Sequence, residues 1–89
     1  MTTKRYIVHG IVQGVGYRYY VYRAAQELDI SGWVRNNPLG TVEVLAGGMA
    51  EQLEKLEAVL RKGPFGSHVE HLEITDETEE TSGQFRVVM

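Results

Sequence analysis

The first half of the chain shows two hydrophobic periods, one typical of strands and one typical of helices. Residues 6–12 are mostly apolar and β-branched, and they predict a strand. From Arg18 onward, apolar residues recur at the spacing of one helix face: Val21, Ala24, Ala25 and Leu28. Residues 32–36 and 41–46 predict two more strands, and the turn-forming composition of residues 37–40 joins them as a hairpin.

The second half alternates between helix and strand in the same way. After Gly47 and Gly48, a second apolar stripe predicts a helix that ends at Gly63-Pro64: Met49, Leu53, Leu56 and Leu60. Residues 67–75 alternate in polarity and predict a fourth strand. The segment 76–83 contains a run of acids typical of a solvated loop: Asp76, Glu77, Glu79 and Glu80. Phe85 and Val87 then predict a short last strand.

This order of elements, βαββαβ plus a terminal strand, predicts an α+β fold. Right-handed crossovers and one hairpin arrange it as a ferredoxin-like sandwich, an antiparallel sheet with both helices on one face and a short C-terminal strand. At 89 residues, the chain is expected to form a single domain over residues 1–89. Because this fold hosts many unrelated functions, the activity has to be inferred from particular residues.

Composition narrows the classes of protein that the chain can belong to. There is no cysteine, so neither a disulfide framework nor a thiolate zinc site is expected. The formal net charge of −3 argues against a nucleic-acid partner, which needs a basic surface. No apolar run approaches the ~20 residues of a membrane helix, and residues 1–5 carry no apolar signal stretch. We therefore expect a cytoplasmic monomer without a membrane partner.

The segment with candidate chemistry is the glycine-rich turn between the first strand and the first helix. Gly14 and Gly16 allow the backbone to curl with its amides inward, and the helix N-terminus that follows favours an anion. Arg18 lies at this positive end with no acid nearby, whereas Glu27 and Asp29 lie at the other end, so the charges oppose the helix dipole. A bound anion would offset that cost. The residues alone leave open a plain turn followed by a solvated Arg18.

Two segments resemble motifs of the acylphosphatase family. Residues 12–18 (Val-Gln-Gly-Val-Gly-Tyr-Arg) are similar to its signature, and residues 32–36 (Gly-Trp-Val-Arg-Asn) with 40–43 (Gly-Thr-Val-Glu) are similar to its second motif. The resemblance extends over nearly the whole chain. It implies a metal-independent hydrolase, without a cofactor, that cleaves the carboxyl–phosphate anhydride of small acyl phosphates. Inorganic phosphate would be both its product and a competitive inhibitor.

The resemblance also implies roles for individual residues. Arg18 and Asn36 would be catalytic, with Asn36 orienting the attacking water. The guanidinium of Arg18 would hold the phosphate together with the backbone amides of five residues: Gly14, Val15, Gly16, Tyr17 and Arg18. Three residues differ from those common in the family, namely Asp29 for a glycine after the first helix, Leu39 for an aspartate before Gly40, and Tyr17 for a phenylalanine.

Such a reaction needs few chemical groups. The leaving group is a carboxylate whose conjugate acid has a pKa of ~4, so no general acid is required to expel it at neutral pH. Positioning and charge stabilisation then supply most of the catalysis. An asparagine is not a base, so we expect the proton of the water to pass to the phosphate itself. Without the resemblance, Asn36-Asn37-Pro38 is an ordinary exit from a strand into a turn.

Three other functions compete with this one: RNA binding, non-catalytic sensing and metal binding. RNA-binding domains of the same strand order carry a basic, aromatic third strand, whereas residues 41–46 contain neither an aromatic residue nor a cation. A sensor that binds acyl phosphates without turnover would use the same glycine turn and Arg18. The sequence leaves this alternative open. His68 and His71 are three apart on a strand and face opposite sides, so they predict no metal site. His9 is expected to be a surface residue of the first strand.

Overall fold

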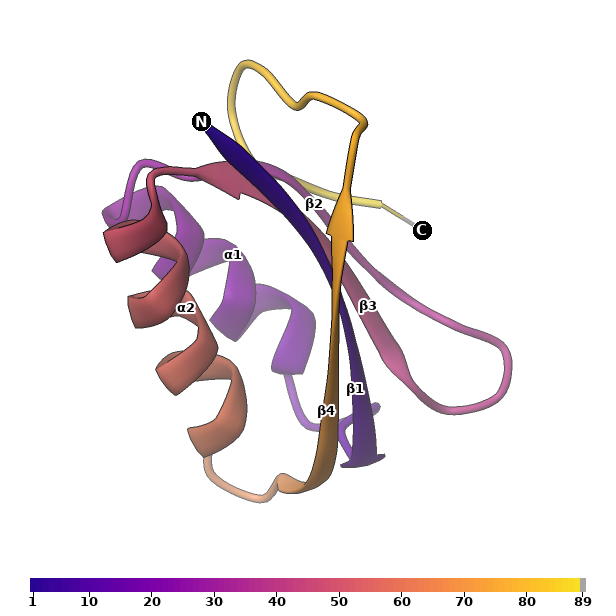
Figure 1. Cartoon of the computed structure of the whole chain (residues 1–89). Coiled ribbons are helices and arrows are strands. Elements are labelled where there is room, and N and C mark those ends of the chain that lie inside the picture. The colour runs from indigo at the N-terminus through magenta and orange to yellow at the C-terminus, as the bar shows by residue number, and fades with distance from the viewer. Residues whose placement is uncertain (89) are drawn as a thin grey trace.

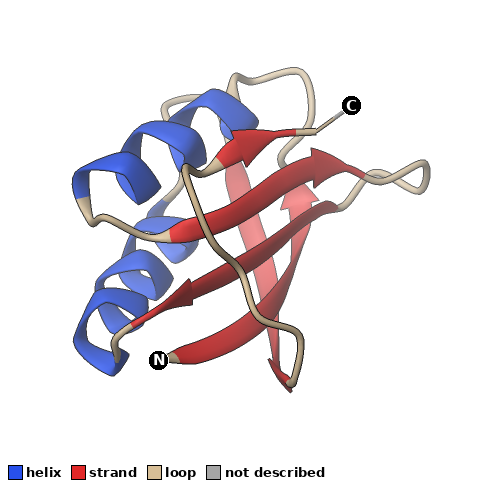
Figure 2. Cartoon of the chain, turned by 90° about the horizontal axis from the view of Figure 1, so that it is seen from above, coloured by secondary structure: helices blue, strands red, loops and turns tan. Residues whose placement is uncertain are grey.

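Seven elements follow one another in the order that the sequence predicts. The computed structural model describes residues 1–88. Its elements are β1 (Thr2–Ile11), α1 (Tyr17–Glu27), β2 (Ser31–Asn36), β3 (Val42–Gly48), α2 (Ala50–Lys62), β4 (His68–Glu77) and β5 (Arg86–Val87). Both helices pack against one face of the sheet (Figures 1 and 2). None of the helices in residues 1–88 is long and apolar enough to cross a membrane.

The sheet has five strands in the order β4-β1-β3-β2-β5. β1 pairs antiparallel with both β3 and β4, and β2 pairs antiparallel with β3, which confirms the predicted ferredoxin-like fold. The short C-terminal strand β5 adds to the edge of β2 in parallel, so the complete sheet is mixed. The direction of this strand was not predicted, because a segment of two residues carries no signal for the strand it will pair with.

The core lies between the sheet and the two helices. Tyr6, Val34 and Val44 from the strands are fully buried. The helical stripes face them through Val21 and Ala25 in α1 and through Leu53, Leu56 and Leu60 in α2. Met49 departs from the prediction: it is the residue that precedes α2, and 63% of it is exposed. Gly47 and Gly48 extend β3 rather than ending it, because they pair with Thr3 and Thr2 of β1.

The first helix ends in a Schellman motif. Asp29 has a φ of 61°, its amide donates to the Gln26 carbonyl (3.1 Å), and the amide of Ile30 donates to the Ala25 carbonyl (2.9 Å). Glycine is the usual residue at this left-handed position, and aspartate is among the few others that adopt it readily. The departure at Asp29 therefore preserves the end of the helix.

An ion-pair network lies on the face of the sheet opposite the helices. The carboxylate of Glu43 accepts hydrogen bonds from Arg5 and from Arg35 (2.9 and 3.1 Å). Both guanidinium groups lie near the ring of Trp33, at 5.8 Å for Arg5 and 4.9 Å for Arg35. Arg5 also donates to Glu77 (3.1 Å). The prediction of a solvated acidic loop was therefore wrong for Asp76 and Glu77, because both belong to β4 and Glu77 is also paired with Arg5.

Glu43 should make the stability of the fold depend on pH. Burial raises the pKa of its carboxyl, but the hydrogen bonds from Arg35 and Arg5 outweigh burial, and the pKa lies below its ordinary value. Its stabilising contribution is therefore complete above the unfolded-state pKa of ~4.3 and is lost as the pH falls through the lower folded-state pKa. We expect Glu43→Gln to reduce the free energy of unfolding by about 1–2 kcal/mol at pH 7, and by less at acid pH.

Urea unfolding of wild type and Glu43→Gln between pH 7 and pH 3 measures this difference. Glu70→Gln is the matched control, because Glu70 is an exposed acid of β4. A difference between wild type and Glu43→Gln that stays constant down to pH 3 would contradict the assigned role of the carboxylate.

Candidate active site

The turn from β1 into α1 adopts left-handed backbone conformations at two glycines. Gly14 has a φ of 75° and Gly16 a φ of 77°. A Cβ atom added at either position would meet nothing within 4 Å, so glycine is needed there for its backbone freedom rather than for space. Val12 and Val15 anchor the two sides of this turn in the core or against it. The chain is thereby reversed within residues 12–16 and enters the helix at Tyr17.

The N-terminus of α1 is left open to an anion. Gly16 precedes the helix without a side-chain cap, and the first turn contains no acidic residue. Intrahelical hydrogen bonding begins where the amide of Tyr20 donates to the carbonyl of Gly16 (3.1 Å). The positive end of the helix dipole at residues 17–19 therefore carries no acidic side chain within the first turn of α1. In α2, in contrast, the charged side chains complement the helix dipole: Glu51 lies in the first turn, and Arg61 and Lys62 lie in the last turn.

A pocket of about 350 Å³ lies at this helix N-terminus. Its lining comes from the turn, the first turn of α1 and the sheet: Val12, Gly14, Gly16, Tyr17, Arg18, Tyr19, Asn36 and Val87. The structure thus brings the two predicted catalytic residues, Arg18 and Asn36, into one pocket with three of the other predicted phosphate-binding residues. Val15 does not line the pocket, because its side chain packs against the core.

Asn36 is the last residue of β2 and pairs with Val42 of β3. Its Oδ1 is buried and has no hydrogen-bond donor within residues 1–88. A buried oxygen without a donor costs about 1–3 kcal/mol, so a ligand or water that satisfies the amide is favoured. Because the amide can turn to offer either its oxygen or its nitrogen, Asn36 can both accept from and donate to a molecule in the pocket.

Gln13 joins the turn to the hairpin that carries Asn36. Its Nε2 donates to the carbonyl of Asn37 (2.7 Å) and to the carbonyl of Thr41 (2.9 Å). These two residues also close the hairpin, because the amide of Asn37 donates to the carbonyl of Thr41 (2.9 Å). One side-chain amide thus fixes the position of the turn relative to β2. Gln13 was not among the site residues predicted from the sequence, where its only signal is a lone amide side chain at the start of a glycine turn.

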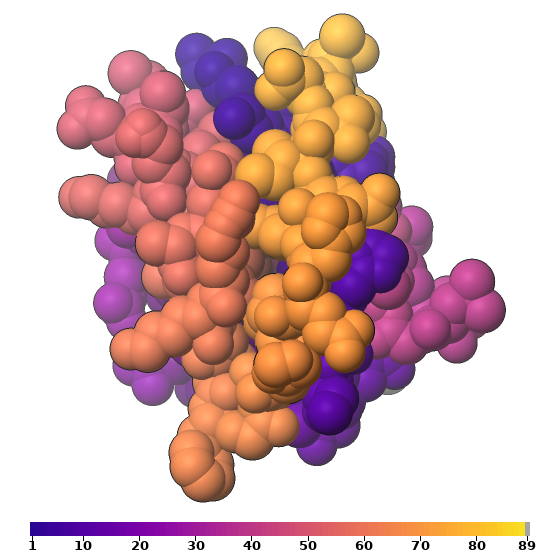
Figure 3. All heavy atoms as spheres, turned by 60° about the horizontal axis from the view of Figure 1, so that its bottom comes forward, coloured from indigo at the N-terminus to yellow at the C-terminus, as the bar shows by residue number. Residues whose placement is uncertain are grey.

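The hairpin tip tolerates the departure at Leu39. Leu39 is 95% exposed, and the tip stands out from the body of the molecule (Figure 3). The turn is closed instead by the backbone, since the amide of Gly40, with a φ of 101°, donates to the carbonyl of Asn37 (3.1 Å). A side chain at position 39 therefore has little influence on the geometry of Asn36.

Tyr17 is the third residue that differs from the one common in the family, and its hydroxyl group binds outside the pocket. The hydroxyl donates to the carbonyl of Leu60 (2.7 Å), and the hydroxyl of Tyr20 donates to the carbonyl of Val59 (2.7 Å). Burial raises the pKa of both phenols, so they remain protonated donors. Two tyrosines of α1 thus satisfy carbonyls in the last turn of α2. A phenylalanine at position 17 would leave the buried carbonyl of Leu60 without this partner.

Two of the histidines lie opposite each other on the neighbouring strands β1 and β4. His9 Nε2 lies 2.5 Å from Glu73 Oε2, and the rings of His9 and His71 are 5.5 Å apart. Within residues 1–88 no group of three or more histidine, cysteine or acidic side chains is placed to hold a metal ion. His9 is a side chain of β1 in an exposed contact with Glu73, in agreement with its predicted place on the strand surface.

Comparison with known proteins points to one family. A sequence model of the acylphosphatase family matches residues 4–87. The acylphosphatase of Koribacter versatilis is 49% identical over 80 residues, which are 90% of this chain and 73% of the relative. The acylphosphatase of Nitratidesulfovibrio vulgaris is 51% identical over 72 residues, 81% of this chain and 72% of the relative. The crystal structure of the Bacillus subtilis acylphosphatase superimposes with a TM-score of 0.96 at 36% identity and covers all of both chains.

Gln13→Glu should disturb the site without changing the size of the side chain. An ionised glutamate only accepts hydrogen bonds, so it would repel the two carbonyls that Gln13 now binds. Displacement of catalytic groups by about 1 Å can cost ~10² in rate, and we expect kcat for acetyl phosphate to fall by at least about tenfold. The control is Gln26→Glu, an exposed position of α1. Steady-state kinetics well below the melting temperature make the comparison, and wild-type kcat in Gln13→Glu would rule out a positioning role.

Proposed function

We propose a mechanism for this chain, which belongs to the acylphosphatase family. The chain hydrolyses acyl phosphates to a carboxylate and inorganic phosphate. The phosphate of the substrate binds at the N-terminus of α1, and Asn36 holds the water that attacks it. The observation that carries this proposal is the shared pocket, where Arg18 and Asn36 lie beside the left-handed turn at Gly14 and Gly16.

The phosphate is held by backbone and side-chain nitrogen donors. The amides belong to the turn and the start of the helix: Gly14, Val15, Gly16, Tyr17 and Arg18. Of Val15 only the amide takes part, since its side chain packs against the core. The guanidinium of Arg18 offers a planar fork that matches two phosphate oxygens. Because these donors are fixed before the substrate arrives, they stabilise the charge of the transition state without reorganisation.

Asn36 positions the water, and the substrate supplies the rest of the chemistry. The water oxygen attacks phosphorus, the bond from phosphorus to the acyl oxygen breaks, and the carboxylate leaves with that electron pair. The amide of Asn36 is not a base, so the proton of the water passes to a phosphate oxygen. The carboxylate needs no protonation at neutral pH, because the pKa of its acid is ~4. The buried Oδ1 of Asn36 supports this role.

No metal ion takes part in the proposed reaction, because nitrogen donors meet the negative charge of the phosphate. Inorganic phosphate, the product, competes with the substrate for the same amides and for Arg18. We further propose that the chain works as a monomer in the cytoplasm, as expected from the sequence; one copy supplies both Arg18 and Asn36 to the pocket.

Alanine substitutions of Arg18 and Asn36 should differ in kind. Arginines that stabilise phosphoryl transfer are worth ~10³–10⁵ in rate, so Arg18→Ala should lose both kcat and affinity for phosphate. Asn36→Ala should lower kcat by about 10² while phosphate still inhibits competitively, because Asn36 contacts the water rather than the phosphate. Steady-state hydrolysis of acetyl phosphate, with phosphate as inhibitor, measures both parameters.

The matched control is Arg61→Ala, which removes an exposed arginine of α2 from outside the pocket. All assays are repeated with excess chelator, which should leave the wild-type rate unchanged. Full activity in Asn36→Ala with an intact fold would remove that residue from the mechanism. Loss of wild-type activity on chelation, restored by a divalent cation, would overturn the metal-independent scheme.

A further inference from the structure

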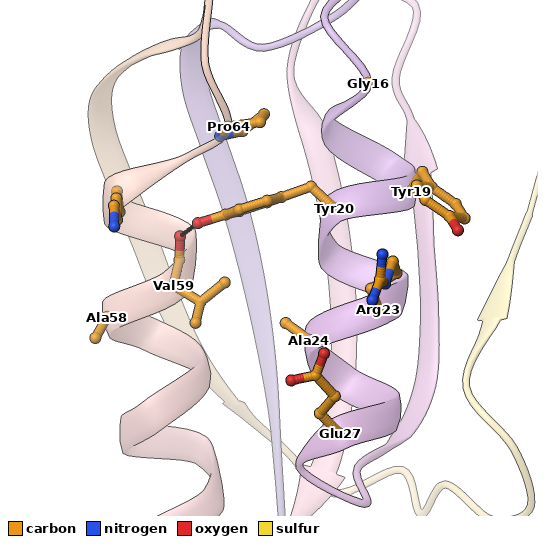
Figure 4. A pocket seen from close by; sticks show the side chains of 10 residues that line it. Gly16, Tyr19, Tyr20, Arg23, Ala24, Glu27, Ala58, Val59 and Pro64 are labelled. Atoms are coloured by element: carbon orange, nitrogen blue, oxygen red, sulfur yellow. Dashed lines mark hydrogen bonds between the residues drawn. The ribbon is translucent and has the colours of Figure 1, made fainter.

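A second and larger depression lies between the two helices. It is next to the pocket that contains Arg18 and Asn36, here called the phosphate pocket. This α1–α2 groove has a volume of about 630 Å³, within the range of small-molecule sites. Its apolar lining comes from both helices and from the second residue after α2: Tyr19, Tyr20, Ala24, Ala58, Val59 and Pro64. Figure 4 shows Tyr20 reaching across the groove to the carbonyl of Val59, where its hydroxyl donates a hydrogen bond (2.7 Å).

The groove is continuous with the phosphate pocket. Gly16 and Tyr19 line both, and the ring of Tyr19 is 62% exposed at their junction. A molecule whose phosphate lies at the helix N-terminus therefore has a path along an apolar surface toward Ala24 and Ala58. Over the seven residues from Gly16 to Arg23 the helix rises about 10 Å, so only an extended group reaches that far.

The chemistry of the reaction selects the groove as the place of the acyl group. α1 packs onto the sheet through β2 and β5, and α2 lies next to it on the same face of the sheet (Figure 1). Asn36 belongs to β2, so the attacking water approaches the phosphate from the sheet side. In phosphoryl transfer the attacking and leaving oxygens lie roughly in line. The acyl oxygen therefore leaves on the side away from Asn36, toward the α1–α2 groove.

Charged side chains border the apolar lining. Arg23 and Lys62 also line the groove, and long basic side chains carry a hydrocarbon stem below the charge. Glu27 lies at the end of the groove remote from Gly16 (Figure 4). Two small residues, Ala24 and Ala58, keep the space between the helices open. This combination fits a hydrocarbon chain that lies along the helices.

We propose that the α1–α2 groove binds the acyl group of the substrate and favours acyl phosphates with an extended apolar chain over acetyl phosphate. The proposal rests on the proposed function, because the direction of the leaving group follows from the position of Asn36. It adds a specificity site to a catalytic pocket that by itself recognises only phosphate.

The test compares acetyl, butyryl and hexanoyl phosphate. These substrates share the same leaving-group chemistry, so a change in kcat/KM with chain length reports binding of the chain. For wild type we expect hexanoyl phosphate to exceed acetyl phosphate by about tenfold in kcat/KM. Ala58→Trp fills the groove outside the phosphate pocket and should remove this preference while leaving kcat/KM for acetyl phosphate unchanged.

Ala50→Trp is the control, since Ala50 is an exposed alanine at the opposite end of α2. Circular dichroism and melting temperature verify that both variants fold. No gain with chain length in wild type, or equal effects of the two tryptophans, would overturn the proposal. An altered molecular mass in Ala58→Trp with an unchanged chain-length preference would identify the groove as a protein contact and would also overturn it. An active Asn36→Ala would overturn the proposed function instead, and the tryptophan pair would still report whether the groove binds the chain.

Discussion

The reversal of the chain between β1 and α1 is the constraint on which the fold and the site depend. Within residues 12–16 the backbone leaves the sheet, passes through two left-handed glycines and starts a helix without an acidic cap. The same turn places the helix N-terminus beside Asn36, and the two hydrogen bonds of Gln13 fix that distance. Because the proposed phosphate site consists largely of backbone amides, its geometry is as stable as the fold itself, and the proposed reaction needs only the side chains of Arg18 and Asn36 in addition.

Local patterns allowed the elements to be predicted from the sequence, and they also drew attention to the residues of the proposed site. Each helix and strand buries one face, and this produces a hydrophobic period that can be read from residues close together in the sequence. The helical stripes that include Val21 and Leu53 are examples. The glycine turn and Arg18 were identified through the opposed helix dipole and the resemblance to acylphosphatases, which also identified Asn36. Met49 was misplaced because a helix stripe does not distinguish the first helical residue from the residue before it.

Interactions between distant segments could not be predicted. Glu77 pairs with Arg5, 72 residues away, and this pairing depends on the register of β1 against β4, which no local pattern contains. The hydrogen bond from Tyr17 to Leu60 likewise depends on the packing of α1 against α2. The hydrogen bond from Gln13 to Asn37 depends on the packing of the glycine turn against the β2–β3 hairpin. The α1–α2 groove could not be predicted for the same reason, because its lining comes from two helices that are far apart in the sequence.

The central claim is that the N-terminus of α1 and Arg18 together hold phosphate, and ligand-induced thermal stabilisation tests it most directly. Inorganic phosphate at about ten times its Kd adds RT ln 11, about 1.4 kcal/mol, to the stability of the native state. For a domain of this size, each kcal/mol raises the melting temperature by roughly 4–8 °C. With chloride at matched ionic strength as the reference, the account predicts a rise of several degrees in wild type and little or none in Arg18→Ala. Equal rises in the two proteins would show general stabilisation by the salt and would contradict the account.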